Sequence, residues 1–211
     1  MKSILLALAT LALLVGCSGG NESSGNAGNS KSSQPVGKAS ITETGRSAFQ
    51  KTYISARGWA ADAQPYSEES QPTQEVPGGD GKATVWTARF GSASRGSAKA
   101  FTWSGSDAPD APARGVIGGA EDSFNPSNRS TRTFDLGFLK VDSDQAIAEA
   151  AKHGGKKLLE KDSKMPVFYR LHWDPNDNIL VWNVMFGGNG SDARLNVRLD
   201  ATTGAFIKIE K

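Results

Sequence analysis

The chain has very few cysteines and histidines and almost no excess of charge. Its 211 residues include one cysteine, Cys17, and two histidines. A single cysteine excludes a disulfide framework and any site built on several cysteines, and two histidines exclude a histidine-rich metal site. The formal net charge is only +2. Nucleic-acid binding needs a concentrated basic surface, so we expect no nucleic-acid partner.

The N-terminus has the pattern of a bacterial lipoprotein signal peptide. A basic start at Lys2 precedes an apolar run over residues 4–15, which is too short to span a bilayer core of ~30 Å. Leu-Val-Gly-Cys at residues 14–17 matches the lipobox, whose cysteine thiol receives a diacylglycerol before cleavage. We therefore predict a signal peptide over 1–16 and acylation, for example with palmitate, of Cys17. The alternative is an ordinary cleaved signal with an incidental cysteine.

The residues after Cys17 predict a tether outside the cytoplasm. Residues 18–34 are almost all Ser, Gly and Asn and contain too little apolar surface to fold, so the segment 17–38 is expected to be a disordered tether. No spanning segment is expected after it, so the membrane contact is predicted to be the lipid on Cys17. Ser18 stands where an Asp usually retains lipoproteins at the inner membrane. We expect the periplasmic face of the outer membrane in a Gram-negative cell and the cell surface in a Gram-positive one.

The rest of the chain alternates helical and strand patterns. Apolar residues recur at three- and four-residue steps over Gly45–Ala63 and Ser143–His153, with Thr44 or Thr42 as the first N-cap and an Asp142/Gln145 capping box before the second. Period-two alternation predicts strands at Ala83–Ala93, Ala98–Ser104, Val167–Trp173 and Arg194–Asp200. The run Ile179–Phe186 is apolar on both faces except at Asn183, which predicts a central strand, and a last strand is placed at Ala205–Glu210 after the turn of residues 200–204. Residues 106–132 are rich in Pro, Gly, Ser and Asn and are predicted to be an irregular connection.

This order predicts an α+β fold with a helix packed on an antiparallel sheet, repeated twice. We expect one unit over 39–120 and a second over 133–211, each helix lying on the strands that come after it. The first helix should bury Phe49, Tyr53 and Trp59, and the second should bury Ile147 and Ala150. The alternative is a single α+β domain whose two helices happen to precede strands.

The second half resembles a PepSY domain. The resemblance lies in the helix of residues 142–150 with Gly154-Gly155 behind it, the strand of residues 167–171 and the closing segment of residues 197–207, which contains Asp-Ala-Thr-Thr-Gly at 200–204. It covers about residues 138–211, and the first half lacks the Asp-x-x-Thr-Gly turn. The resemblance implies a cystatin-like fold, no catalytic residues and a role in protein binding, for which peptidase inhibition is proposed. In the turn itself, Asp200 can act as a cap and Gly204 can take a positive φ.

No constellation of catalytic or metal-binding residues stands out. Cys17 is used for the lipid, no Gly-x-Ser-x-Gly or His-Glu-x-x-His motif is present, and the Asp174-x-Asn-x-Asn run lacks the glycine and glutamate of a calcium loop. We therefore expect no enzyme activity, no metal and no cofactor. The one surface feature is a basic, hydrogen-bonding stripe on the strand faces that point away from the core, for which the candidate residues are Arg170, His172, Arg194, Asn196 and Arg198.

Two functions fit these patterns. The first is a lipid-anchored binding protein in which this stripe docks an envelope protein, such as a peptidase that it restrains, or a cell-wall polymer. The second is an envelope carrier or sensor that holds a small apolar ligand between helix and sheet. A solvated polar sheet face with no binding role is the plainer interpretation of the stripe.

Overall fold

The computed structural model describes residues 39–210; the predicted signal peptide, Cys17 and the tether lie outside these described residues. The helices are α1 (Gly45–Trp59), α2 (Ser143–Ala150) and α3 (Lys156–Lys161), with a π-helical turn η3 (Ala151–Gly155) and 3-10 turns η1 (Arg129–Thr131), η2 (Leu136–Phe138) and η4 (Gly190–Asp192). The strands of the first half are β1 (Glu43–Thr44), β2 (Gln64–Gln71), β3 (Lys82–Ala83), β4 (Val85–Ser92), β5 (Ser97–Ser104) and β6 (Gly115–Ser123). Those of the second half are β7 (Val167–Asp174), β8 (Ile179–Phe186), β9 (Leu195–Asp200) and β10 (Phe206–Glu210).

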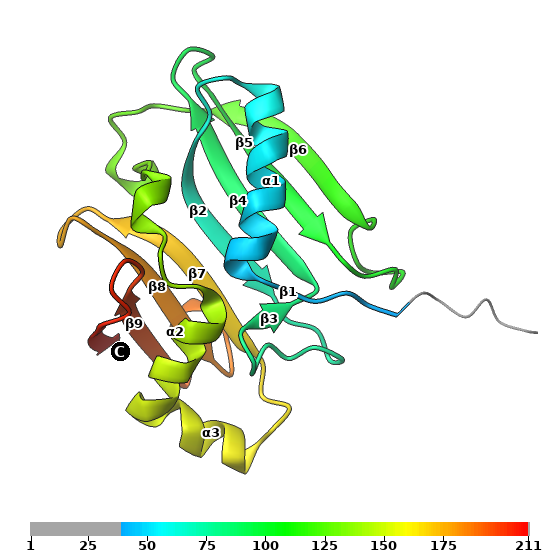
Figure 1. The fold of residues 1–211 in the computed structure, drawn as a ribbon, viewed down its shortest axis with the longest axis vertical. Helices are drawn as coiled ribbons and strands as arrows, with labels where there is room; N and C mark the ends of the chain where they lie inside the picture. The colour runs from blue at the N-terminus through cyan, green and yellow to red at the C-terminus, as the bar shows by residue number, and fades with distance from the viewer. Residues whose placement is uncertain (1–38, 211) are drawn as a thin grey trace, which may run out of the picture. The chain divides into compact units, whose positions relative to one another are not determined.

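One continuous antiparallel sheet forms the body of the described residues. Its eight strands lie in the order β10-β9-β8-β7-β2-β4-β5-β6, and every neighbouring pair is antiparallel. The first long strand of each half, β2 and β7, therefore meet in the middle, and each half extends outward from that seam. Both long helices lie on the same face of the sheet (Figure 1). The predicted α+β fold with helices on an antiparallel sheet is confirmed.

Each helix packs on the strands of its own half. α1 contacts β2, β4, β5 and β6, whereas α2 contacts β8 and β9. Of the predicted core residues, Phe49, Ile147 and Ala150 are buried, while Tyr53 and Trp59 are partly buried and pack against the core. The helix-to-sheet arrangement that a duplication requires is therefore present, but the two halves share one sheet.

Two tryptophans occupy equivalent places in the two halves. Trp86 on β4 donates its indole N–H to the carbonyl of Glu43, and Trp182 on β8 donates to the carbonyl of Val141, both over 2.9 Å. Each acceptor lies two residues before the first residue of the helix that comes after it. Both indoles are fully buried, and their rings meet edge to face with centroids 6.4 Å apart. The same local contact therefore occurs once in each half.

The helix N-termini meet at the seam between the halves. Asp142 caps α2 through the predicted capping box with Gln145. Its carboxylate also accepts hydrogen bonds from the Thr44 hydroxyl at 2.7 Å and from the backbone N–H of Arg46 at 2.8 Å, so it caps α1 as well. The Ser143 hydroxyl accepts the N–H of Gly45 over 2.8 Å. A carboxylate there interacts favourably with the positive ends of both helices.

Glu68 lies in the core, on the sheet face that the helices cover. Its side chain is fully buried, and neither carboxylate oxygen has a hydrogen-bond partner among the described residues. Burial, reinforced by the negative charge of Asp142, raises the pKa of Glu68 well above its ordinary value. Burial in the core therefore disfavours the charged form of this carboxyl group.

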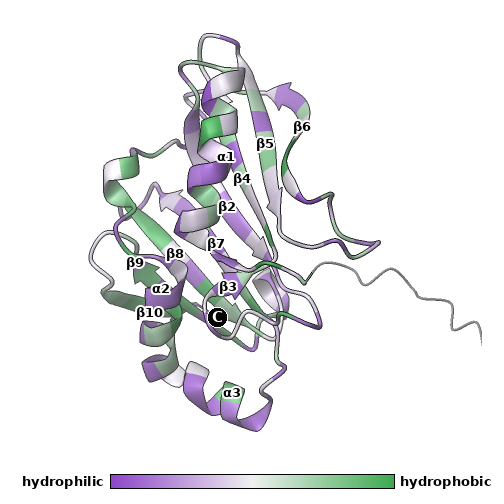
Figure 2. Cartoon of the chain, turned by 45° about the vertical axis from the view of Figure 1, so that its right-hand side comes forward, coloured by the Kyte–Doolittle hydropathy of each residue, from purple (hydrophilic) through white to green (hydrophobic). Residues whose placement is uncertain are grey.

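Several predicted boundaries need correction. β2 and β6 were not expected: β2 begins directly after the predicted end of the first helix, and β6 lies inside the predicted irregular connection of residues 106–132. β2 is polar along its whole length, in contrast with the hydrophobic β8 (Figure 2), and β6 contains three glycines. Neither strand has an apolar alternation that would predict it, although β2 buries Ser67, Glu68 and Ser70 between its two neighbours. α1 ends at Trp59, four residues before the predicted end. Gly154, directly after the predicted end of the second helix at His153, has a positive φ of 111°, yet the chain continues into α3.

Candidate functional site

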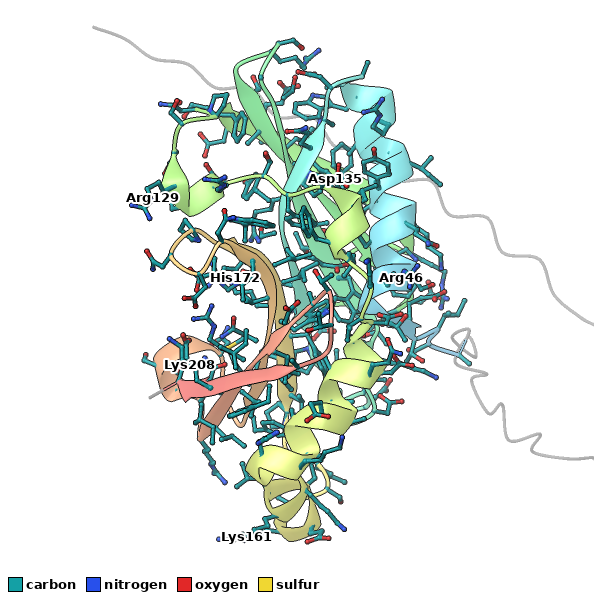
Figure 3. All side chains as sticks on the ribbon, turned by 60° about the vertical axis from the view of Figure 1, so that its left-hand side comes forward. Arg46, Arg129, Asp135, Lys161, His172 and Lys208 are labelled. Carbon is teal, nitrogen blue, oxygen red and sulfur yellow. The ribbon has the colours of Figure 1, made fainter. Side chains whose placement is uncertain are left out.

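The sheet face opposite α1 and α2, called here the outer face, is polar along one row of cross-strand neighbours. The strand register places Glu69, Arg170, Asn183 and Arg198 side by side on β2, β7, β8 and β9. Figure 3 shows His172 and Lys208 on this side of the sheet, away from α1 and Arg46. Alternate residues of a strand share a face, and the strand register decides which of these residues become neighbours in the row.

A large open hollow, called here the outer groove, lies on this face over the second half. It has a volume of about 870 Å³ and extends from the central seam to the loop between β8 and β9. Its most informative lining residues are Phe168, Arg170, Asn183, Met185, Asn189 and Arg194. At its inner end the groove reaches the seam, where β2 and β7 pair over only three residues, up to Glu69 and Arg170, while the other ladders of β2 and β7 contain seven and eight pairs.

Beyond that pairing the seam is joined by a side chain. The hydroxyl of Ser70 accepts the backbone N–H of Tyr169 over 2.9 Å, so the two backbones stand apart at this point. Ser70 and Tyr169 both line the groove at its inner end. The inner end of the groove therefore lies where the ladder between the two four-stranded halves stops.

Four of the five predicted face residues line this groove, and the fifth does not. Arg170, His172, Arg194 and Asn196 all contribute to its lining. Arg198 lies in the same row but is only 4% exposed, so the prediction that it forms part of an accessible basic stripe is wrong. The reason is that acidic partners from two other elements cover its guanidinium.

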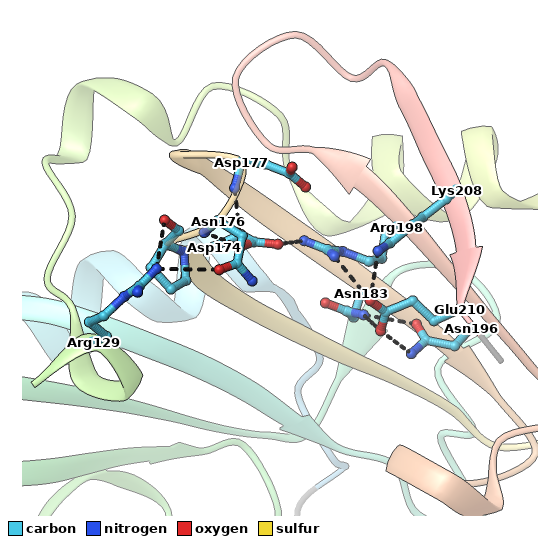
Figure 4. A network of polar contacts seen from close by, with 10 residues as sticks. Arg129, Asp174, Asn176, Asp177, Asn183, Asn196, Arg198, Lys208 and Glu210 are labelled. Carbon is cyan, nitrogen blue, oxygen red and sulfur yellow. Dashed lines mark hydrogen bonds and ion pairs between the residues drawn. The ribbon is translucent and has the colours of Figure 1, made fainter.

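Those partners form a buried polar network, drawn in Figure 4. Arg198 donates one N–H to Asp174, at the end of β7, and another to Glu210 on β10 at 3.0 Å. Asn183 donates to Asn196 over 3.0 Å and to Glu210 over 3.4 Å. Burial would raise the pKa of Asp174, but hydrogen bonds from Arg198 and from backbone N–H groups of the adjacent turn hold that pKa below its ordinary value. Burial would likewise lower the pKa of Arg198, but its pairing with Asp174 and Glu210 raises that pKa instead. The network therefore stays ionised and fixes the floor beside the groove.

His172 is uncharged at neutral pH. Burial, together with the positive charges of Arg170 and Arg198, lowers its pKa to about 4, although Asp174 and Glu210 act in the opposite direction. Its Nδ1 atom is buried and has no hydrogen-bond partner among the described residues. A catalytic imidazole needs an orienting group on one nitrogen, and none is present here in the described part of the chain. The other histidine, His153, stacks on Phe206 with ring centroids 3.7 Å apart.

The outer face of the first half has a different character. Thr87 and Thr102 share a hydrogen bond of 2.9 Å across β4 and β5. Arg89 forms an ion pair with Glu69 over 3.0 Å. This half contributes Glu69 and Ser70 of β2 to the lining of the outer groove, and the rest of the lining comes from the second half.

The closing turn is structural. Asp200 accepts the backbone N–H groups of Thr202 at 2.7 Å and Thr203 at 3.2 Å, and Gly204 has a φ of 79°. Both predicted roles, a capping Asp200 and a Gly204 with positive φ, are confirmed. The turn connects β9 to β10 and so places Glu210 next to Arg198.

Neither a cluster of metal-ligating side chains nor a membrane-spanning helix occurs in the part of the chain that the structure describes. Within residues 39–210, no three His, Cys, Asp or Glu side chains gather in a way that could hold a metal ion. In the same range, none of the helices combines the length and the apolarity needed to cross a bilayer.

Comparisons with known proteins locate the fold but no family. No protein-family profile matches the chain, so the PepSY resemblance is not confirmed. No curated protein sequence matches it either. A crystal structure of a protein from Clostridium difficile 630, described as a "putative lipoprotein", superimposes with a TM-score of 0.52 and 12% identity, over 77% of this chain and 91% of that one. At this identity the likeness establishes a shared α+β fold.

Proposed function

We propose that this protein is a lipid-anchored, extracytoplasmic binding protein that docks another protein on its outer face. The observation that carries the proposal is the outer groove, a hollow of about 870 Å³ on the sheet face opposite the helices. It combines charged, amide and apolar side chains, as protein-binding surfaces do. Part of its lining lies on the paired strands β7, β8 and β9, where little backbone ordering is needed on binding, while Asn189 and Arg194 lie in the loop between β8 and β9.

The anchor is proposed from the N-terminal sequence. Cys17 occupies the cleavage position of a lipobox, and the chain has no other cysteine. The protein of similar fold from Clostridium difficile 630 is itself described as a "putative lipoprotein", which supports the same assignment here. The tether predicted at 17–38 would leave the outer face accessible to partners in the envelope. Ser18, the residue after Cys17, favours the outer membrane in a two-membrane envelope and the cell surface in a one-membrane envelope.

Restraint of a peptidase is the form of docking that the PepSY resemblance favours. Binding in place of catalysis agrees with the unoriented imidazole of His172 and with the pairing of Arg198, which leaves that guanidinium unavailable to a substrate. The carrier alternative has no comparable support. The space between helices and sheet is filled by large buried side chains, which include Trp86, Trp182 and Phe90.

The test of docking is a comparison of charge reversals on the two faces. Envelope extracts are passed over the full-length protein, its Arg170→Glu/Arg194→Glu variant and an Arg57→Glu control, in which the exposed arginine of α1 is changed. We expect a partner to be retained by the wild type and the control and lost from the double variant. Equal retention of the partner by all three proteins would show that it does not dock on the outer face.

The test of the anchor is metabolic labelling with palmitate. The wild-type protein should incorporate the label and begin at Cys17, and a Cys17→Ser variant should do neither. Unlabelled wild-type protein that begins at a different residue would contradict the lipoprotein assignment.

A further inference from the structure

The lining of the outer groove holds two arginines, Arg170 and Arg194, and two glutamates, Glu69 and Glu210, and further cations lie at its margin. Two carboxylates near it are already shared between cations: Glu69 pairs with Arg89 at 3.0 Å and Arg170 at 3.3 Å, and Glu210 pairs with Arg198 at 3.0 Å and Lys208 at 3.7 Å. Asp174 pairs with Arg198 in addition. The groove and its margin therefore hold more guanidinium and ammonium groups than carboxylates.

Among the arginines of the groove, Arg194 has no acidic partner in the described residues. No hydrogen bond or ion pair joins its guanidinium to any other residue within 39–210, and the side chain is exposed at the wall of the groove. Its aliphatic part lies over Gly187, where a Cβ atom would come within 3.1 Å of Arg194 Cγ and Cδ. Gly187 thus lets the arginine stem lie against the loop, and the stem holds the charge in place.

Arg170 supplies a second, partly available guanidinium. Its side chain is 52% exposed and contacts Glu69 through Nε, which leaves its terminal nitrogens without an ion-pair partner in the described part of the chain. A carboxylate prefers a guanidinium because two parallel N–H donors can engage both of its oxygens. The groove therefore presents donors suited to a carboxylate.

The floor of the groove indicates a peptide as the bearer of that carboxylate. Asn183 is 5% exposed, and its Oδ1 atom has no donor among the described residues. Such an acceptor is satisfied by an N–H donor, which a polypeptide backbone offers and a phosphate or sulfate does not. Phe168 and Met185 add apolar area beside it, which suits an aliphatic or aromatic side chain.

We propose that the outer groove binds an extended peptide segment of the docking partner and holds an aspartate or glutamate side chain of that segment with Arg194 and Arg170. The proposal rests on the proposed function and makes it specific: the partner presents an acidic residue flanked by apolar ones. Arg194 provides the main charge and Arg170 assists it. The amides of Asn183 and Asn189 face the peptide backbone.

The experiment is a selection from a display library of short random peptides on the full-length protein held in detergent micelles. The termini of the peptides are blocked, so that only side chains carry charge. We expect Asp and Glu to be enriched about tenfold over Asn and Gln at one position, the discrimination of one charge-assisted hydrogen bond. Arg194→Gln, which keeps the stem and removes the charge, should abolish this preference. Arg194→Glu should reverse it toward Lys and Arg, and the Arg57→Glu control should keep it.

The outcomes separate this inference from the proposed function. Equal enrichment of acids and amides, or the same preference in Arg194→Glu as in the wild type, overturns the acidic-peptide inference; docking still stands if the envelope partner is lost from the Arg170→Glu/Arg194→Glu variant. Dextran sulfate serves as a non-peptide anion. If it binds while no peptide is enriched, the groove belongs to an anionic polymer and the inference fails. The charge reversal in Arg194→Glu keeps the test valid because a misfolded variant would select no peptide at all.

Discussion

Replacement of Asp142 by alanine should destabilise the whole fold by more than one helix cap is worth. The Asp142 carboxylate accepts hydrogen bonds from its own helix, through the N–H of Ser143 at 2.7 Å, and from the other half, through Thr44 and Arg46 at 2.7 and 2.8 Å. Loss of an N-cap alone costs ~0.5–2 kcal/mol. Hydrogen bonds to a charged group add ~1.5–3 kcal/mol where water cannot replace them. Because the side chain is half-buried and water replaces part of what is lost, we expect a total of about 3 kcal/mol.

The assay is urea unfolding of the full-length protein, monitored by tryptophan fluorescence. Gln145→Ala is the matched control, since it removes only the reciprocal capping bond from Gln145 to the N–H of Asp142. It should cost about 0.5 kcal/mol. A double-mutant cycle with Thr44→Ala should give a coupling of about 1 kcal/mol between residues that are far apart in sequence. If Asp142→Ala costs no more than Gln145→Ala, the shared cap does not join the halves and this reasoning is refuted.

Three other substitutions, in the core and beside the groove, should change stability. Glu68→Met should stabilise the protein above pH 4.5. The folded pKa of Glu68 is raised from 4.5, so the free energy of unfolding of the wild type falls by about 1.4 kcal/mol per pH unit from pH 4.5 up to that folded pKa. An unchanged pH dependence of the unfolding free energy in the variant would contradict this. His172→Gln should remove a pH dependence of the opposite sign. Because the pKa of His172 is lowered from 6.5 to about 4, the wild type loses roughly 3 kcal/mol of unfolding free energy as the pH falls through that window. Equal stability profiles against pH in the two proteins would exclude this effect. Gly45→Ala should destabilise the protein by about 1–3 kcal/mol, since its Cβ would lie 2.8 Å from the fixed ring of Trp182. Gly58→Ala in the same helix is the control: its Cβ meets nothing within 4 Å and should stabilise the protein by about 0.5 kcal/mol. A stability change of the same sign in both variants would disprove the close packing at Gly45.

The parts of the fold that sequence reasoning predicted are those with local causes. Thr44 and Asp142 are caps that act within one turn, and both helices begin where these residues place them. In the second half β7 and β9 alternate apolar and polar residues and β8 is a continuous apolar run, and their order along the chain fixes hairpin neighbours. β2 and β6 have no such pattern. β2 is a central strand because β4 and β7 pair with it from both sides, and that pairing depends on residues far away in the sequence.

In the site, too, the sequence predicts what depends on local pattern and does not predict what depends on strand register. Alternation places Arg170 and His172 on one face, and the hairpin from β8 to β9 brings Asn196 beside them. Burial of Arg198 could not be predicted, because Asp174 and Glu210 reach it from two other strands and only the register decides which side chains meet. Polar residues inside the strongly apolar run of β8, such as Asn183, are the one signal that could have pointed to the groove floor.

The central claim is that partners dock on the outer face, and site-specific photo-crosslinking in living cells tests it most directly. A photoreactive residue is placed at Asn189 in the outer groove, at Ile117 on the outer face of β6, or at Ile54 on α1, whose side chain is 73% exposed on the helix side. If partners dock on the outer face, we expect one discrete adduct from Asn189 and none from Ile54. The adduct from Asn189 should disappear when Arg170 and Arg194 are both changed to glutamate. An adduct at Ile117 would extend the surface to the first half. Adducts from Ile54 with none from Asn189 would contradict the account.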